Sequence, residues 1–231
     1  MGSWIKIKAA DGFALSAWLA QPRGEARGAV VLVQEIFGVN SHIRNVAQRL
    51  ADEGYCVVAP ALFDRAMPEV ELGYSPEGIG QGVQLMQRAS FDDALRDVDA
   101  ARAHAASISG GQPVAVMGFC WGGLVAWLSA TRLNGFAAAV PYYPGGIGNF
   151  VKEAPRCPVL AHFAEHDDHI PLSEAEALRA AHPGQVTVHI YPAHHGFNCD
   201  ERGSYHAASA AQAWERSLRF LMLNLHKARD A

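Results

Sequence analysis

Short continuous runs of apolar residues alternate with longer helical segments along most of this chain. The run 29–34, AVVLVQ, is rich in β-branched residues, which is typical of a strand buried on both faces of a parallel sheet. Strands that alternate with helices build βαβ units, so the pattern predicts an α/β fold with a mostly parallel central sheet. Further strands are predicted at residues 55–59, 114–117, 136–140, 159–163 and 186–190.

The segments between these runs carry helix signals, and helices are expected on both faces of the sheet. Residues 173–181 begin with a candidate capping box, formed by Ser173 and Glu176. The N-terminal stretch 4–22 is expected to add one or two antiparallel strands at one edge. Helices are also predicted at residues 41–53, 90–106 and 121–130, and in a last stretch with one apolar face, 207–225.

The composition supports one large folded unit. Half of the 231 residues are hydrophobic and 18% are charged, which excludes intrinsic disorder. Because α/β domains often exceed 200 residues, we expect a single domain over residues 1–231. Residues 61–89 break the alternation with Pro68, Pro76 and four glycines, and show only a weak helical signal after Glu77. This segment is either a lid or substrate loop, or a surface excursion without a role.

Charge and hydropathy set the expected location. The net charge of −4 gives no reason to expect nucleic acid or an anionic membrane as a partner. The N-terminus has no apolar leader, and the longest apolar stretch, 113–128, is short for a membrane span. The four cysteines are widely spaced and form no CxxC pair. We therefore expect a cytoplasmic protein, as a monomer or alternatively a homodimer.

Residues 118–122, Gly-Phe-Cys-Trp-Gly, match the pattern of a nucleophile elbow, with Cys120 where serine is usual. A predicted strand precedes the pattern and a predicted helix follows it. The flanking glycines allow the sharp turn, and the amino end of the new helix favours a thiolate and can stabilise an oxyanion. The alternative is a buried structural cysteine beside a glycine turn.

A nucleophilic thiol needs a base, and the base needs an acid that orients it. The strand at 159–163 leads into a group of acids that includes Asp167 and Asp168, and the strand at 186–190 leads into His194 and His195. The chain order of nucleophile, acid and histidine is the one expected for this kind of fold. On the residues alone, the choice within each pair stays open.

Four segments of the chain resemble the dienelactone hydrolase family, which has the α/β-hydrolase fold. They are residues 34–40 (QEIFGVN), 118–123 (GFCWGG), 167–171 (DDHIP) and 195–197 (HGF). The resemblance spans about residues 4–225 and implies cleavage of an ester or lactone by a Cys-His-Asp triad, without a cofactor. The family acid precedes a proline by four residues, which selects Asp167. The family histidine precedes a phenylalanine by two residues, which selects His195.

The resemblance also implies roles for three further residues. Glu35 matches a glutamate that contacts the nucleophilic thiol and helps to form the thiolate when substrate arrives. The backbone N–H groups of Ile36 and Trp121 match the oxyanion hole. In this reading a thioester forms on Cys120, and His195, oriented by Asp167, activates the water that hydrolyses it.

The sequence departs from the family where a substrate carboxylate is held. Family members of the chlorocatechol pathway use arginines, one of them four residues after the histidine, where this chain has Cys199. Another family arginine lies in the segment after the third strand, but residues 66–87 of this chain contain no arginine or lysine. We therefore expect a small-molecule ester or lactone as substrate but leave its identity open. Arg202 and Arg65 are candidates for the missing role.

Three alternatives compete with this interpretation. The same fold could be a non-catalytic scaffold with Cys120 as a redox sensor, although an intact triad argues against lost catalysis. Aminoacyl-ester hydrolysis or peptidase activity on the same fold is a weaker alternative, because peptide cleavage usually adds a larger cap or propeller domain, for which 231 residues leave little room. A zinc site is disfavoured because no HExxH or His-x-His motif is present, so no metal is expected. Its candidate ligands are His166, Asp167, Asp168, His169, His194 and His195.

Overall fold

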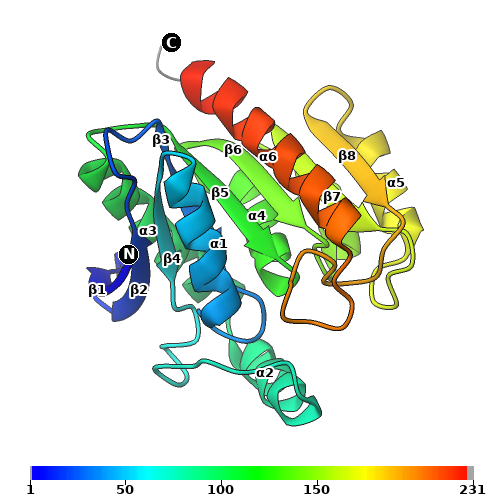
Figure 1. The fold of residues 1–231 in the computed structure, drawn as a ribbon, viewed down its shortest axis with the longest axis horizontal. Helices are drawn as coiled ribbons and strands as arrows, with labels where there is room; N and C mark the ends of the chain where they lie inside the picture. Colours follow the sequence, from blue (N-terminus) through cyan, green and yellow to red (C-terminus); the bar gives the residue numbers. More distant parts are fainter. Residues whose placement is uncertain (1, 228–231) are drawn as a thin grey trace.

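A sheet of eight strands runs through the middle of the molecule, in the order β1-β2-β4-β3-β5-β6-β7-β8 (Figure 1). The computed structural model describes residues 2–227. Neighbouring strands in the series β4-β3-β5-β6-β7-β8 pair in parallel, whereas β2 runs antiparallel to both β1 and β4. The predicted antiparallel edge is thus confirmed. The strands are β1 (Ser3–Lys8), β2 (Ala14–Ala20), β3 (Gly28–Val33), β4 (Tyr55–Pro60), β5 (Val114–Phe119), β6 (Phe136–Tyr142), β7 (Val159–Ala164) and β8 (Val186–Tyr191).

Helices cover both faces of the sheet, as predicted. In Figure 1, α1 and α6 lie in front of the strands, and α3 and α4 lie behind them. None of the helices within residues 2–227 combines the length and the apolar character that crossing a membrane requires. The helices are α1 (Ser41–Asp52), α2 (Pro76–Arg88), α3 (Phe91–Ile108), α4 (Trp121–Arg132), α5 (Leu172–Ala181) and α6 (Ala207–Lys227).

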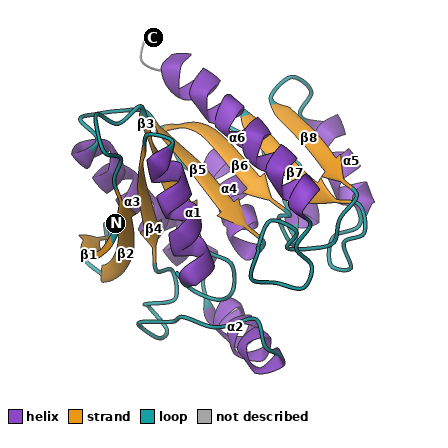
Figure 2. Cartoon of the chain, in the orientation of Figure 1, coloured by secondary structure: helices purple, strands orange, loops and turns teal. Residues whose placement is uncertain are grey.

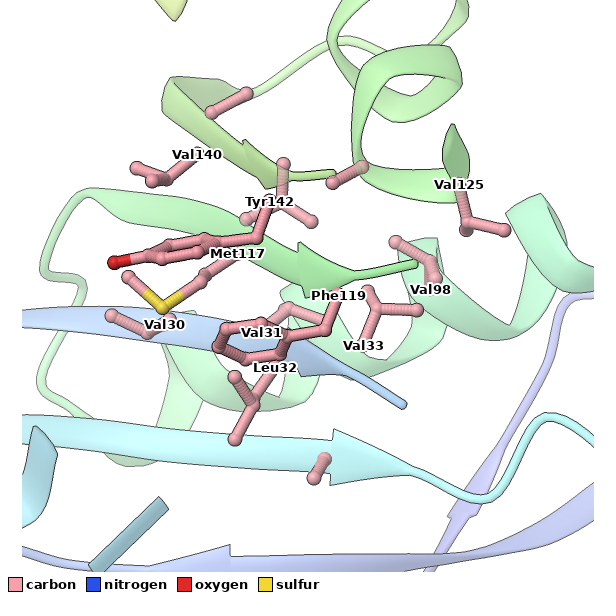
Figure 3. Packing of buried hydrophobic residues seen from close by; sticks show 14 of the residues in the cluster. Val30, Val31, Leu32, Val33, Val98, Met117, Phe119, Val125, Val140 and Tyr142 are labelled. Atoms are coloured by element: carbon pink, nitrogen blue, oxygen red, sulfur yellow. The ribbon is translucent and has the colours of Figure 1, made fainter. Parts of the chain in front are cut away.

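The core lies between these layers. Every residue of β3, β4, β5 and β7 is buried, so these strands have no polar face, as their unbroken apolar runs predict. Figure 3 shows Val30 to Val33 packed with Met117 and Phe119 of β5, and with Val98 of α3 and Val125 of α4 nearby. The rigid central strands hold their carboxyl ends, and the loops that follow them, at one edge.

The capping box predicted at Ser173 and Glu176 does not form. Helix α5 begins at Leu172, one residue earlier than expected, and Pro171 is its N-cap. Ser173 therefore lies inside the first turn, where its side chain cannot cap the helix. Glu176 instead pairs with Arg179 one turn further along, at 2.7 Å.

The segment 61–89 contains a regular helix in its second half, which the sequence indicated only weakly. Helix α2 follows Ser75, whose Oγ accepts a hydrogen bond from Gly78 N at 3.2 Å, and begins with Pro76. Its glycines lower helix propensity, but they allow close packing. A Cβ at Gly82 would lie only 2.4 Å from the carbonyl oxygen of Ile36. Figure 2 shows α2 standing apart from the layers of the sheet.

The first half of this segment packs on the loop that follows β3. Leu72 N donates to Phe37 O at 2.9 Å, and Asn40 Nδ2 donates to Leu72 O at 3.2 Å. Gly38 has a φ of +79°, and a Cβ there would lie 1.9 Å from Val70 O. The segment 61–89 thus lies against the loop that carries Glu35 and Ile36.

Candidate active site

Cys120 lies at the tip of a sharp turn between β5 and α4. Its φ of +55° is in the left-handed region that non-glycine residues rarely adopt. A Cβ at Gly118 would lie 2.0 Å from Gly122 O, and one at Gly122 would lie 2.2 Å from Gln34 O. A Cβ at Gly123 would lie 2.5 Å from Tyr142 O on the sheet. The turn therefore requires glycine at these positions, as the elbow pattern predicts.

His195 and Asp167 meet at the carboxyl edge of the sheet. His195 follows β8, Asp167 follows β7, and their Nδ1 and Oδ2 atoms are 2.7 Å apart. Asp167 Oδ1 also accepts from the backbone N–H groups of His169 and Ile170, at 2.9 and 3.1 Å. The Asp167 side chain is only 1% exposed. Asp168 and His194 are exposed, and the His194 ring lies beside His166 instead.

The surroundings of His195 favour its protonated form. Burial opposes the charge, but the hydrogen bond with Asp167 and the nearby Cys120 thiol outweigh it and raise the pKa of His195 to about 10. Burial alone would raise the pKa of the Asp167 carboxyl, but the hydrogen bonds from His195 and the two backbone N–H groups outweigh it and lower this pKa. Cys120, His195 and Asp167 thus form one electrostatically coupled row.

Glu35 is buried on the same edge and is held by two side chains. Arg202 Nη1 lies 3.3 Å from its Oε1, and Tyr74 Oη lies 3.4 Å from its Oε2. Arg202 also lies over the rings of Phe37 and Tyr74, at 5.8 and 5.6 Å from their centroids. The expected link between Glu35 and the Cys120 thiol stays a prediction.

The two loops that carry the predicted oxyanion donors lie side by side. Gly122, next to Trp121, approaches the carbonyl oxygens of Val33 and Gln34, just before Ile36. Trp121 is the first residue of α4, where backbone N–H groups have no partner within the helix. This brings the segments of Ile36 and Trp121 together, while their role as donors stays a prediction.

Arg202 occupies this site and Arg65 does not. Arg65 is held elsewhere by Asp97 and Asp11, with N–O distances of 2.7 and 2.8 Å. Arg202 lies seven residues beyond His195, and its Nη1 lies 2.6 Å from where a Cβ at Gly196 would be. A side chain at position 196 would displace the guanidinium, so the glycine after His195 leaves room for it.

Sequence reasoning missed Tyr143, whose ring packs in a T-shaped arrangement with that of His195, at 5.0 Å between centroids. Tyr143 is buried, has a φ of +34°, and its hydroxyl has no hydrogen-bond partner among the described residues. Burial, together with the nearby Glu35 carboxylate, raises the pKa of the Tyr143 hydroxyl well above its usual value. Its place directly after β6, on the carboxyl edge, was the signal available in the sequence.

The mostly parallel sheet, with a nucleophile elbow after β5 and an Asp–His pair after β7 and β8, defines an α/β hydrolase. The model of the dienelactone hydrolase family matches residues 15–224. The chain belongs to the dienelactone hydrolase family, and it is a hydrolase that acts on ester or lactone bonds.

Relatives and solved structures agree with this assignment. The chain is 38% identical over 219 residues to a candidate carboxymethylenebutenolidase from Synechocystis, covering 87% of this chain and 89% of the relative. It is 33% identical over 227 residues to the carboxymethylenebutenolidase of Pseudomonas putida, covering 94% of each. The crystal structure of a candidate dienelactone hydrolase from Klebsiella pneumoniae superimposes with a TM-score of 0.80 at 32% identity, covering 94% of this chain and 98% of that one.

Proposed function

We propose that this hydrolase cleaves small esters or lactones through a Cys120 thioester, with His195 as base and Asp167 as the acid that orients it. The observation that carries the proposal is the strained Cys120 at the amino end of α4, beside a His195 ring that Asp167 holds at 2.7 Å. Strain at a single non-glycine residue is common where a nucleophile is presented to substrate. The helix end adds partial positive charge where a thiolate would form.

The reaction runs in two acyl-transfer steps. The Cys120 thiol gives its proton to Glu35 and its sulfur attacks the carbonyl carbon, while the N–H groups of Ile36 and Trp121 bind the resulting oxyanion. The carbon–oxygen bond to the alcohol breaks, and the alcohol takes a proton from His195. Water then adds to the thioester carbonyl and gives a proton to His195. The carbon–sulfur bond breaks to release the acid, and the sulfur regains its proton from Glu35.

We further propose that the substrate carries a carboxylate, which Arg202 binds. The guanidinium is half-buried beside Glu35 and flanked by two aromatic rings, a setting in which a planar bidentate ion pair is strong. A substrate carboxylate on Arg202 competes with Glu35 for the same cation. Glu35 is then free to accept the thiol proton, which couples binding to activation.

Replacing Cys120 with Ala should abolish hydrolysis of p-nitrophenyl acetate and of a panel of lactones. The far-ultraviolet circular dichroism spectrum should not change. Cys157→Ala is the control, because Cys157 is likewise a free cysteine but precedes β7, at the opposite end of the strand from the site. Full activity in the Cys120→Ala variant would overturn the triad.

Replacing Arg202 with Gln should raise KM for carboxylate-bearing esters by about tenfold to a hundredfold, the value of a charged hydrogen bond. KM for neutral esters of the same size should change far less. Arg179→Gln, an exposed arginine paired with Glu176, serves as the control. An equal loss for charged and neutral esters would show that Arg202 supports the structure of the site rather than recognising a carboxylate.

A further inference from the structure

Three potential metal ligands meet beside the proposed catalytic row. Glu35 comes from the loop after β3, His42 from the first turn of α1, and Cys199 from the loop after β8. Their candidate ligand atoms, a carboxylate oxygen, a ring nitrogen and Sγ, all lie within 4.8 Å of one another. The exposed fractions of the three residues are 1%, 1% and 0%. His42 and Cys199 have no part in the proposed reaction.

His42 is the observation that points to a ligand. Both of its ring nitrogens are buried, and neither has a hydrogen-bond partner among the described residues. The nearest carboxylate oxygen, Asp200 Oδ1, lies 3.4 Å from Nδ1 without making a hydrogen bond. The His42 ring also lies beside the apolar ring of Phe119, at 6.0 Å between centroids. A buried imidazole without partners is costly, so such a group needs an explanation.

We infer that Glu35, His42 and Cys199 form a binding site for a borderline divalent cation of the Zn²⁺ type. A thiolate, an imidazole and a carboxylate are the donor types that Zn²⁺ accepts, whereas Mg²⁺ and Ca²⁺ prefer oxygen donors alone. Three protein ligands leave the fourth tetrahedral position for water. We assign the metal to His42 Nε2, because Nδ1 faces Asp200, and a carboxylate on the second nitrogen is the usual support of a metal-bound histidine.

Binding of the cation exchanges ligands and involves no change of oxidation state. The cation loses water ligands and gains bonds to the Glu35 carboxylate, the His42 ring and the Cys199 sulfur. The proton of the Cys199 thiol passes to solvent. Asp200, whose side chain is 61% exposed, marks the side of the cluster that is nearest to water.

The ion acts as an inhibitor rather than a cofactor. Arg202 lies 3.3 Å from Glu35 and repels a second positive charge, so the cation must replace the guanidinium on that carboxylate. Tyr74 also leaves Glu35, since its hydroxyl lies 3.4 Å from the second oxygen. A metal-bound Glu35 cannot accept a proton from Cys120. This inhibitory effect rests on the proposed function, whereas the binding of the cation does not.

Binding is measured in the Cys120→Ala variant, which removes the competing Cys120–His195 pair. Titration with Cd²⁺ should give one equivalent of metal and the ultraviolet absorption of a cadmium–thiolate bond. In this background, Cys199→Ser should abolish the absorption, and His42→Gln should weaken binding by at least about tenfold. Cys157→Ser, and the double change His166→Asn with His194→Asn, are matched controls that should leave binding unchanged.

The outcomes separate the two proposals. Absorption that persists in Cys199→Ser overturns the site. So does absorption that appears in the enzyme with Cys120 but not in the Cys120→Ala variant. Should His42→Gln fold poorly, the same point is tested with Zn²⁺ by thermal unfolding: the ion should raise Tm in Cys120→Ala but not once Cys199→Ser is added. In the enzyme with Cys120, Zn²⁺ should inhibit and EDTA should restore the rate. Tight binding without inhibition would leave the site standing and refute the role of Glu35.

Discussion

Two buried histidines of this protein have opposite electrostatic surroundings. His162, within β7, lies 2.8 Å from Tyr191 Oη and 2.9 Å from Ser217 Oγ. His195, after β8, lies 2.7 Å from the Asp167 carboxylate and beside the Cys120 thiol. Burial lowers the pKa of His162 well below 6.5, whereas the pKa of His195 rises to about 10. The charge of the partner, and not burial, decides the state of the ring.

The two hydrogen-bond networks also differ in whether a substrate can reach them. Ser217 Oγ donates to Ala213 O at 2.8 Å, so it accepts from His162 Nε2 and from Tyr142 Oη, the latter at 2.7 Å. His162 Nδ1 then accepts from Tyr191, and every polar atom of this group has a partner. The group joins α6 to the sheet. His195 uses one nitrogen for Asp167 and the other for the Cys120 thiol, and Cys120 is partly exposed, so this network is open to a reacting molecule.

The largest expected effects separate activity from stability in two variants. His195→Ala should lower kcat by about a hundredfold to ten-thousandfold, the usual contribution of general base catalysis. His162→Ala should lower the free energy of unfolding by about 1–3 kcal/mol, because Tyr191 and Ser217 lose a buried partner. Steady-state kinetics and urea denaturation of the same preparations measure both effects.

His194→Ala is the control for His195, because it removes an exposed neighbour with the same side chain. It should leave kcat nearly unchanged. The comparison breaks if His162→Ala costs activity at constant stability, or if His194 proves more important than His195.

A smaller effect concerns the dependence of stability on pH. The pKa of His162 is lowered in the folded state, so the unfolded chain binds more protons and stability is lost as pH falls below about 6.5. The pKa of His195 is raised, so its contribution is complete below about 6.5 and is lost as pH rises toward about 10. Urea denaturation across this range measures the free energy of unfolding against pH. His162→Ala should weaken its dependence on pH on the acid side, and His195→Ala should weaken it on the alkaline side. Slopes of the same sign for both variants would contradict the opposed charge states.

The sequence predicts best what depends on neighbours along the chain. The buried strands β3 and β5 follow from unbroken apolar runs, and the elbow follows from the glycines around Cys120. Helix α2 was underestimated, because its glycines lower helix propensity while serving close packing against Ile36. In these places local preference and tertiary packing give different answers.

The site was predictable only in part for the same reason. Cys120 could be selected from its pattern, while Asp167 and His195 were separated from their neighbours only by the family resemblance. The contact of Arg202 with Glu35 joins residues 167 positions apart, and no local pattern indicates it. Tyr74 and His42 likewise acquire their surroundings only when distant loops fold together.

The packing of residues 61–89 on the loop after β3 has a consequence for protein engineering. The two segments touch through carbonyl groups at Gly38 and Gly82, where a β-carbon would lie 1.9 and 2.4 Å from oxygen. A chimera that takes only residues 61–89 from a relative therefore places a foreign segment against the native loop after β3. Poor packing would then act on Ile36, which contacts Gly82. Libraries that aim to change substrate preference should recombine residues 35–40 and 61–89 as a single cassette.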